Sequence, residues 1–182
     1  MPTQLWLIDP MHSEIMFKVR HMLITNVSGT FDMYQATMYS DAPDFSDMQI
    51  QFEAEVSSIN TRNDHRDDHL RSNDFFDTVN NPTLKFESTG ISRKEGNTYD
   101  LNGNFTIRGV EKPITLKIEF TGTVLDLYGQ RKAGFEISGL INRNEYGLTW
   151  KHLGSEITKE EATKSIRKLK DLISAKIGRA HV

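Results

Sequence analysis

The chain has 182 residues, of which 37% are hydrophobic and 26% are charged, and it contains no cysteine. A formal net charge of −3, without a basic run on any predicted strand, argues against a nucleic-acid partner. The absence of cysteine excludes disulfide and thiol chemistry. No apolar stretch has the length of a transmembrane helix, so we expect no stable membrane insertion.

The first residues, MPTQLWLIDPMHSE, lack the basic start and apolar run of a secretory signal peptide. We therefore expect a cytoplasmic location, and a periplasmic one only if the sequence is that of a processed form. No linker rich in Pro, Ser or Gly interrupts the chain. Its length is sufficient to bury a large core without a metal ion or a disulfide.

Eight segments are predicted as strands: residues 4–8 are a short apolar run, and the other segments alternate apolar and polar residues with a period of two, the pattern of a half-buried β-strand. In the clearest of them, Ile50, Phe52 and Ala54 face one way and the Gln and Glu residues between them face the other. The segments span residues 4–8, 12–22, 27–38, 48–59, 83–89, 99–107, 114–120 and 131–141. A long sheet with one apolar face curls and closes, because closure removes its exposed edges. We therefore predict an all-β fold, an antiparallel β-barrel of about eight strands.

The least strand-like segment is NDHRDDHLRSNDFFDTVNNP, at residues 63–82. Its first half is densely charged, and Leu70, Phe75 and Phe76 follow on an apolar side. We predict one short helical plug over about residues 64–77, which covers part of the barrel.

The interior of such a barrel has two alternatives, because eight strands enclose either packed side chains or one small ligand. The inward residues are rich in Phe, Ile, Val, Met and Leu, and Gly103 and Gly139 are expected to leave gaps. An apolar interior with space suits an apolar ligand, whereas a filled interior is a solid core. The pattern by itself leaves both alternatives open.

Four motifs occur in order between residues 4 and 150. They are W-x-I-D-x-x-H-S-x-I-x-F-x-V-x-H-M followed by V-x-G-x-F (6–31), S-I-x-T with R-D-x-H-L-R-S-x-D-F-F-D (58–77), G-x-F-T-I-R-G-V-x-K-P (103–113) and N-R-x-E-Y-G-L-x-W (142–150). Each motif alone is weak. Together, in this order, they resemble the YceI-like, polyisoprenoid-binding family.

The resemblance implies a lipocalin-like antiparallel barrel with a long apolar cavity. It implies a ligand such as a polyisoprenoid, an isoprenoid quinone or a similar long-chain amphiphilic lipid. It also implies a carrier, storage or binding protein without catalysis and without a cofactor. The expected partner is therefore a lipid, and a homodimer is left open beside a monomer.

Burial of apolar ligand surface is worth roughly 25 cal/mol per Å², so a long chain can bind by shape without a special polar contact. Phe75 and Phe76 either form a lid over the ligand or close the core. His21 and Arg143 are the predicted head-group contacts; otherwise His21 bonds the backbone and Arg143 pairs with an acidic residue, Glu145 or Asp9. The residues predicted to line the cavity are Ile15, Phe17, Val19, Phe31, Ile50, Phe52, Phe75, Phe76, Phe86, Leu101, Phe105, Leu116, Ile118, Phe135 and Ile137.

An alternative function is a metal-dependent barrel enzyme. His65 and His69 are four residues apart, so they share a helix face, and three aspartates lie between residues 64 and 68. Two histidines and a carboxylate form a metal-ligand set, but nearby arginines can pair with the acids, and His65 does not match the family motif. No catalytic triad or phosphate-binding glycine loop is present, and we predict no metal site. A further alternative is a solid-core barrel with a stress-related interaction role.

After residue 150 the sequence departs from the family, in which one or two closing strands are expected. Thr158 and Glu161 resemble a capping box, and Ile166 and Leu169 belong to an apolar series with helical spacing. We predict a C-terminal helix over about residues 159–175.

We accordingly divide the chain into a barrel domain, residues 1–153, and an atypical helical tail, residues 154–182. The last residues, IGRAHV (177–182), resemble a translated sequencing adapter. This resemblance suggests the hypothesis that residues 177–182 are a read-through artefact and that residues 154–176 belong to a misjoined read. A re-amplified gene that encodes IGRAHV before a stop codon would contradict it.

Overall fold

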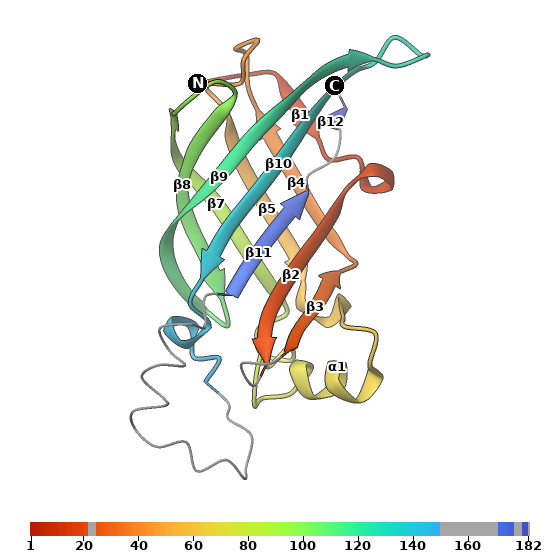
Figure 1. Cartoon of the computed structure of the whole chain (residues 1–182), viewed down its shortest axis with the longest axis vertical. Coiled ribbons are helices and arrows are strands. Elements are labelled where there is room, and N and C mark those ends of the chain that lie inside the picture. Colours follow the sequence, from red (N-terminus) through yellow and green to blue (C-terminus); the bar gives the residue numbers. More distant parts are fainter. Residues whose placement is uncertain (22–24, 150–170, 177–179, 182) are drawn as a thin grey trace.

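The computed structural model describes residues 1–21, 25–149, 171–176 and 180–181 (Figure 1). Its strands are β1 (Leu5–Leu7), β2 (Glu14–His21), β3 (Thr25–Phe31), β4 (Tyr34–Tyr39), β5 (Gln49–Glu55), β6 (Ile59–Asn60), β7 (Thr83–Arg93), β8 (Thr98–Ile107), β9 (Val110–Leu125), β10 (Arg131–Ile141), β11 (Asp171–Lys176) and β12 (Ala180–His181). Its helices are α1 (Asp64–Arg71) and the short 3-10 helices η1 (Pro10–His12), η2 (Val56–Ser58) and η3 (Arg143–Tyr146). In the described part of the chain, no helix has the length and apolar composition needed to cross a bilayer.

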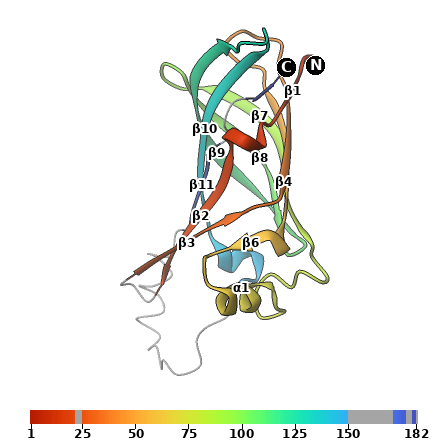
Figure 2. The ribbon, with the colours of Figure 1, turned by 90° about the vertical axis from the view of Figure 1, so that its right-hand side faces the viewer.

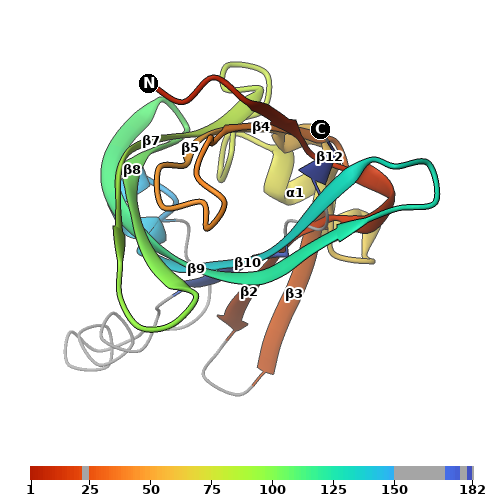
Figure 3. The same cartoon turned by 90° about the horizontal axis from the view of Figure 1, so that it is seen from above.

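The strands form one antiparallel sheet that closes on itself (Figure 3). Hydrogen bonds run in the order β12-β1-β4-β5-β7-β8-β9-β10, and β10 pairs again with β12, so these eight strands form a ring. Strands β11, β2, β3 and β6 continue from β10 in that order, toward α1 (Figure 1). The predicted all-β barrel of about eight strands with one helical plug is confirmed.

The alternation in sequence produces the inside and outside of the barrel directly. In β8, Tyr99, Leu101 and Phe105 are buried, while Asn102 between them is exposed. Because successive side chains of a strand point to opposite faces, every second residue of β8 enters the core. The same burial pattern in β5 and β10 places the core inside the ring.

Two of the predicted strands are interrupted: the one over 27–38, and the one over 48–59, in which η2 separates β5 from β6. The segment predicted over 27–38 forms β3 and β4, separated at Asp32 and Met33. Opposite this break, η1 separates β1 from β2, because Pro10 begins the helical turn and the Asp9 carboxylate accepts a hydrogen bond from the Met11 N–H at 3.1 Å.

The gaps expected at two glycines are filled by neighbouring side chains. A Cβ at Gly103 would overlap the ring of Phe86, and a Cβ at Gly139 would overlap the side chain of Leu116. Each glycine therefore makes room for a large apolar side chain from the adjacent strand. This close packing is typical of a protein interior.

The predicted C-terminal helix is wrong for residues 171–175, which belong to β11. β11 pairs with β10 on one side and with β2 on the other, and β12 pairs with both β10 and β1. Without these strands β10, β1 and β2 would present unpaired N–H and C=O groups, and a strand satisfies those groups whereas a helix does not. The remaining residues of the predicted helix, 159–170, lie outside the described residues. The division after residue 153 and the artefact hypothesis for residues 177–182 stay predictions.

Candidate functional site

The interior of the ring is a continuous apolar core. Nine of the predicted lining residues are buried in it: Ile15, Phe31, Ile50, Phe86, Leu101, Phe105, Ile118, Phe135 and Ile137. Four more are partly buried and pack against it: Phe17, Phe52, Phe76 and Leu116. Val19 and Phe75 are half-buried. Contact of any of these residues with a ligand stays a prediction.

This core leaves an apolar cavity of about 20 Å³ between β1, β4, β5 and β10. The cavity has the size of about one water molecule, whereas small-molecule pockets measure on the order of 300–1,000 Å³. A long chain can occupy this part of the barrel only if side chains around the cavity move. The lining residues are Trp6, Leu7, Ile8, Ala36, Thr37, Met38, Ile50, Phe135 and Ile137.

The loop between β4 and β5, residues 40–48, folds into one end of the ring, which we call the loop end (Figure 3). Phe45 of this loop is fully buried, and its ring centroid lies 4.9 Å from that of Trp6 and 5.0 Å from those of Phe120 and Phe135. Its φ of 60° lies in the left-handed region, which a phenylalanine rarely adopts. Burial of the ring offsets this backbone strain, so Phe45 closes the loop end of the interior.

Polar contacts hold the loop in place around Phe45. The Asp47 carboxylate accepts hydrogen bonds from the Ser40 hydroxyl at 2.5 Å and from the next two backbone N–H groups at 3.0–3.2 Å. Burial alone would raise the pKa of Asp47, but these hydrogen bonds outweigh it and lower that pKa below its usual value. The Tyr99 hydroxyl donates to the Asp44 carbonyl at 2.6 Å, and the Arg93 guanidinium lies 3.3 Å from the Asp44 carboxylate.

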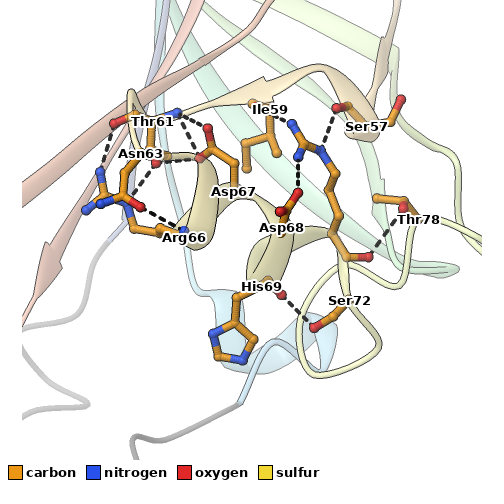
Figure 4. A network of polar contacts seen from close by, with 11 residues as sticks. Ser57, Ile59, Thr61, Asn63, Arg66, Asp67, Asp68, His69, Ser72 and Thr78 are labelled. Atoms are coloured by element: carbon orange, nitrogen blue, oxygen red, sulfur yellow. Dashed lines mark hydrogen bonds and ion pairs between the residues drawn. The ribbon is translucent and has the colours of Figure 1, made fainter.

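Helix α1 covers the opposite end, which we call the helix end (Figure 2). Figure 4 shows how it is fixed. The buried Asp67 carboxylate accepts hydrogen bonds from the Thr61 N–H, at 3.0 and 3.1 Å, and from the Thr61 hydroxyl. Arg66 donates to the Thr61 hydroxyl at 2.7 Å and to its carbonyl at 2.8 Å, and Asn63 caps the helix by accepting from the Arg66 N–H at 2.9 Å. The helix is thereby bound to the chain that leaves β6.

The second half of α1 is fixed by Arg71, which donates to the backbone carbonyls of Ser57 and Ile59 at 2.9 and 3.1 Å. Beyond the helix, Phe76 lies edge-on to Phe31 of the core at 6.2 Å, whereas Phe75 lies edge-on to His69 at 5.3 Å. Of the two plug aromatics, Phe76 is therefore the one that packs against the core.

Helix η3 lies at the same end of the barrel and carries two buried polar atoms without a hydrogen-bond partner in the described structure (Figure 2). They are the hydroxyl of Tyr146 and Nε of Arg143. The Tyr146 ring lies edge-on to Phe105 of the core at 6.2 Å. Burial, together with the charge of Glu145, raises the pKa of Tyr146 to about 12. Residues three apart in a 3-10 helix share one side, so the two groups lie on the same side of η3.

Asp9 and Glu145 are the predicted alternative partners of Arg143. The Asp9 carboxylate is engaged by His12 at 2.9 Å, and Glu145 accepts from the Asn142 amide at 3.5 Å. Among the described residues, Arg143 forms an ion pair with neither of these acids. His21 is the last residue of β2, and its side chain lies outside the described part.

The histidines of α1 do not assemble with its acids. His65 is exposed, His69 lies 3.0 Å from the Asp74 carboxylate, and Asp67 points to Thr61. In the part of the chain that the structure describes, no group of three His, Asp or Glu residues could hold a metal ion. A wider hollow of about 330 Å³ lies at the break between β3 and β4, but its lining is largely polar and acidic.

Sequence reasoning missed Trp6, Met38, Phe45 and Tyr146, although all four are buried in the core. Phe45 had a detectable signal, because it is the lone aromatic in the polar turn DAPDFSD. Tyr146 also had one, since it follows Arg143 by three residues within the fourth motif.

Fold and site together define a lipocalin-like barrel, closed at one end by a loop and at the other by a helix. A YceI-like domain profile matches residues 6–166, and the chain belongs to the YceI-like family.

Three similar proteins show the extent of the likeness. A UPF0312 protein of Staphylococcus epidermidis is 37% identical over 143 residues, which are 78% of this chain and 81% of that protein. The crystal structure of the Campylobacter jejuni YCEI protein has a TM-score of 0.70 at 28% identity, covering 90% of this chain and 89% of that one. A polyisoprenoid binding domain from Saccharophagus degradans has a TM-score of 0.58 at 16% identity and covers 98% of both chains, a likeness that shows the fold alone.

Proposed function

We propose that this protein binds a long-chain apolar lipid, such as a polyisoprenoid or an isoprenoid quinone, inside the barrel and acts as a carrier or store without catalysis. The observation that carries the proposal is the pairing of an apolar interior with two unpartnered polar groups, Arg143 Nε and the Tyr146 hydroxyl, at the helix end. An amphiphile has the complementary division into chain and head group. The name of the related Saccharophagus domain points to the same class of ligand.

Binding requires the interior to open. The cavity of about 20 Å³ lies beside Trp6 and Phe135, both of which contact Phe45. Withdrawal of Phe45 would join this cavity to the space that its ring now fills. Each apolar Å² of ligand then buried contributes roughly 25 cal/mol, so a long chain can offset the loss of the Phe45 contacts.

The head group is proposed to lie against η3. A buried polar atom without a partner costs on the order of 1–3 kcal/mol, and a ligand oxygen would remove that cost. The Arg143 guanidinium suits a phosphate, and the Tyr146 hydroxyl can donate to a phosphate or to a quinone carbonyl.

Native mass spectrometry with lipid extraction of the purified protein tests the proposal. We expect a co-purifying isoprenoid species, or uptake of added ubiquinone or polyprenyl phosphate. A protein that is empty as purified and takes up neither lipid would contradict the proposal and favour the solid-core alternative.

A pair of variants tests the head-group position. Arg143→Gln should weaken binding of polyprenyl phosphate by about tenfold or more, because a hydrogen bond to a charged group is worth about 1.5–3 kcal/mol. Binding of the matching polyprenol, which lacks the phosphate, should stay unchanged. Arg62→Gln, an exposed position before α1, is the matched control. Equal losses for phosphate and alcohol would show that Arg143 supports the fold and not the head group.

A further inference from the structure

The tip of the hairpin formed by β9 and β10, residues 124–129, extends beyond the ring at the loop end (Figure 1). It exposes four large apolar side chains: 50% of Val124, 72% of Leu125, 100% of Leu127 and 90% of Tyr128 are accessible. Single exposed apolar residues are ordinary, but a contiguous group in one turn marks an interaction site.

The charge in this turn is neutralised within the turn itself. Asp126, its charged residue, accepts hydrogen bonds from the N–H groups of Tyr128 and Gln130 at 2.8 and 2.9 Å, and lies 3.5 Å from Lys132 Nζ. The hydrogen bond from Gln130, above all, lowers the pKa of Asp126. The carboxylate therefore points back toward the strands, and the apolar side chains form the outer surface.

The neighbouring cations are engaged as well. Lys132 also lies 3.7 Å from Asp9, and the Arg131 guanidinium lies over the Trp6 ring at 5.6 Å. An electrostatic partner, whether an acidic protein or an anionic surface, would thus find no unpaired cation in residues 124–132 of the described structure.

The size of this apolar surface decides between a protein partner and a lipid bilayer. A stable protein interface uses about 20–30 residues on each side, and this turn offers four apolar side chains. A bilayer surface needs far fewer, because a leucine or tyrosine inserts individually at the boundary between head groups and hydrocarbon. We propose that residues 124–128 insert into a lipid bilayer surface through their apolar side chains, independently of the charge of the lipid.

The position of the turn links its insertion into the membrane to exchange of the lipid ligand. This link rests on the proposed function. Phe120 of β9 and Phe135 of β10 contact Phe45, which closes the loop end. From Phe120 to Leu125 the strand advances roughly 16 Å. Insertion of the turn would therefore bring the loop that closes the barrel close to the membrane, where a lipid can pass between bilayer and interior.

Sedimentation with neutral phosphatidylcholine vesicles, at low and at high salt, tests the proposal. The unaltered chain should bind, with an affinity that salt does not weaken. A triple variant, Leu125→Ser, Leu127→Ser and Tyr128→Ser, should bind at least about tenfold more weakly, because less apolar surface enters the bilayer. The control is Val79→Ser, which removes a side chain that is 90% exposed at the helix end.

Three outcomes would overturn the proposal. The triple variant could bind vesicles as well as the unaltered chain does, or binding could disappear at high salt. Sedimentation velocity could also show that the unaltered chain is a dimer and the triple variant a monomer. The last would assign the turn to a second copy of the chain. Uptake of detergent-dispersed ubiquinone is measured in parallel and should be unchanged in the triple variant. If no protein takes up ubiquinone but the vesicle result holds, the lipid-binding function fails and the membrane contact stands.

Discussion

At the helix end, the buried Asp67 accepts hydrogen bonds from Thr61, and Arg66 and Arg71 bind backbone carbonyls in and around β6. At the loop end, a strained Phe45 fills the interior from a loop that is held by partly exposed polar contacts. The first closure is a network of charge-assisted hydrogen bonds that break together with the fold. The second combines the Phe45 ring with contacts inside a single loop, and the proposed function requires it to open while the barrel stays folded.

The largest expected effect is that of Phe45→Ala. It removes a fully buried ring, so the free energy of unfolding should fall by about 3 kcal/mol. Uptake of ubiquinone should become about tenfold faster or more, because the barrier to opening is lowered. Quenching of Trp6 fluorescence by the quinone measures the rate in proteins that also carry Trp150→Phe, since Trp6 lies beside Phe45 and Trp150 is the second tryptophan of the chain.

Phe105→Ala is the control for this variant. It removes a ring of the core near Tyr146, at the helix end, and should lower stability by a similar amount without faster uptake. If both variants accelerated uptake equally, general loosening and not the loop would control access.

A somewhat smaller loss, about 2–3 kcal/mol of unfolding free energy, is expected for Asp67→Ala, because the Thr61 N–H and hydroxyl lose their acceptor in a buried site. Urea unfolding measures it. Asp64→Ala, an exposed position of the same helix, should change stability by no more than about 0.5 kcal/mol. Uptake should keep its rate in both variants. Faster uptake by Asp67→Ala would show that the ligand enters at the helix end.

The smallest effect at neutral pH is expected for Tyr146→Phe. The hydroxyl is buried without a partner, so its removal should be neutral or should stabilise the free protein by about 1 kcal/mol. Above pH 10 the unfolded chain loses this proton while the folded chain, with a pKa of about 12, retains it. The unaltered protein should therefore lose about 2 kcal/mol of stability between pH 10 and pH 12, and the variant should lose less.

Urea unfolding at a series of pH values tests this expectation. Equal losses in the two proteins would show that Tyr146 ionises as easily in the folded state as in the unfolded state. If Tyr146→Phe stabilises the free protein but weakens binding of ubiquinone, the unpartnered hydroxyl serves the ligand and not the fold.

Much of this fold could be predicted from the pattern of the chain. Period-two alternation in segments such as β5 and β8 predicts which face is buried, because it depends only on neighbouring residues. The charged face of α1 and its cap, Asn63, are local in the same sense. Apart from Phe75 and Phe76 of the plug, the lining residues followed from the same alternation, and thirteen of the fifteen predicted residues lie in the core or against it.

The parts that failed depend on distant partners. Residues 171–175 have helical spacing in sequence, but the edges of β10 and β2 impose a strand on them. Gly103 and Gly139 suggest empty space until Phe86 and Leu116 fill it from the next strand. In both cases the deciding groups lie far away along the chain.

By itself, then, the sequence determined the class of fold, the buried face of each strand and the membership of a family with recognisable motifs, since all of these are written in short-range patterns. Only the tertiary structure decided that Phe45 closes one end of the barrel, that Arg143 and Tyr146 leave polar atoms unpaired at the other, and that the C-terminal segment completes the ring. Closure of a barrel brings together residues from opposite ends of the chain, and no local pattern can record which of them will meet.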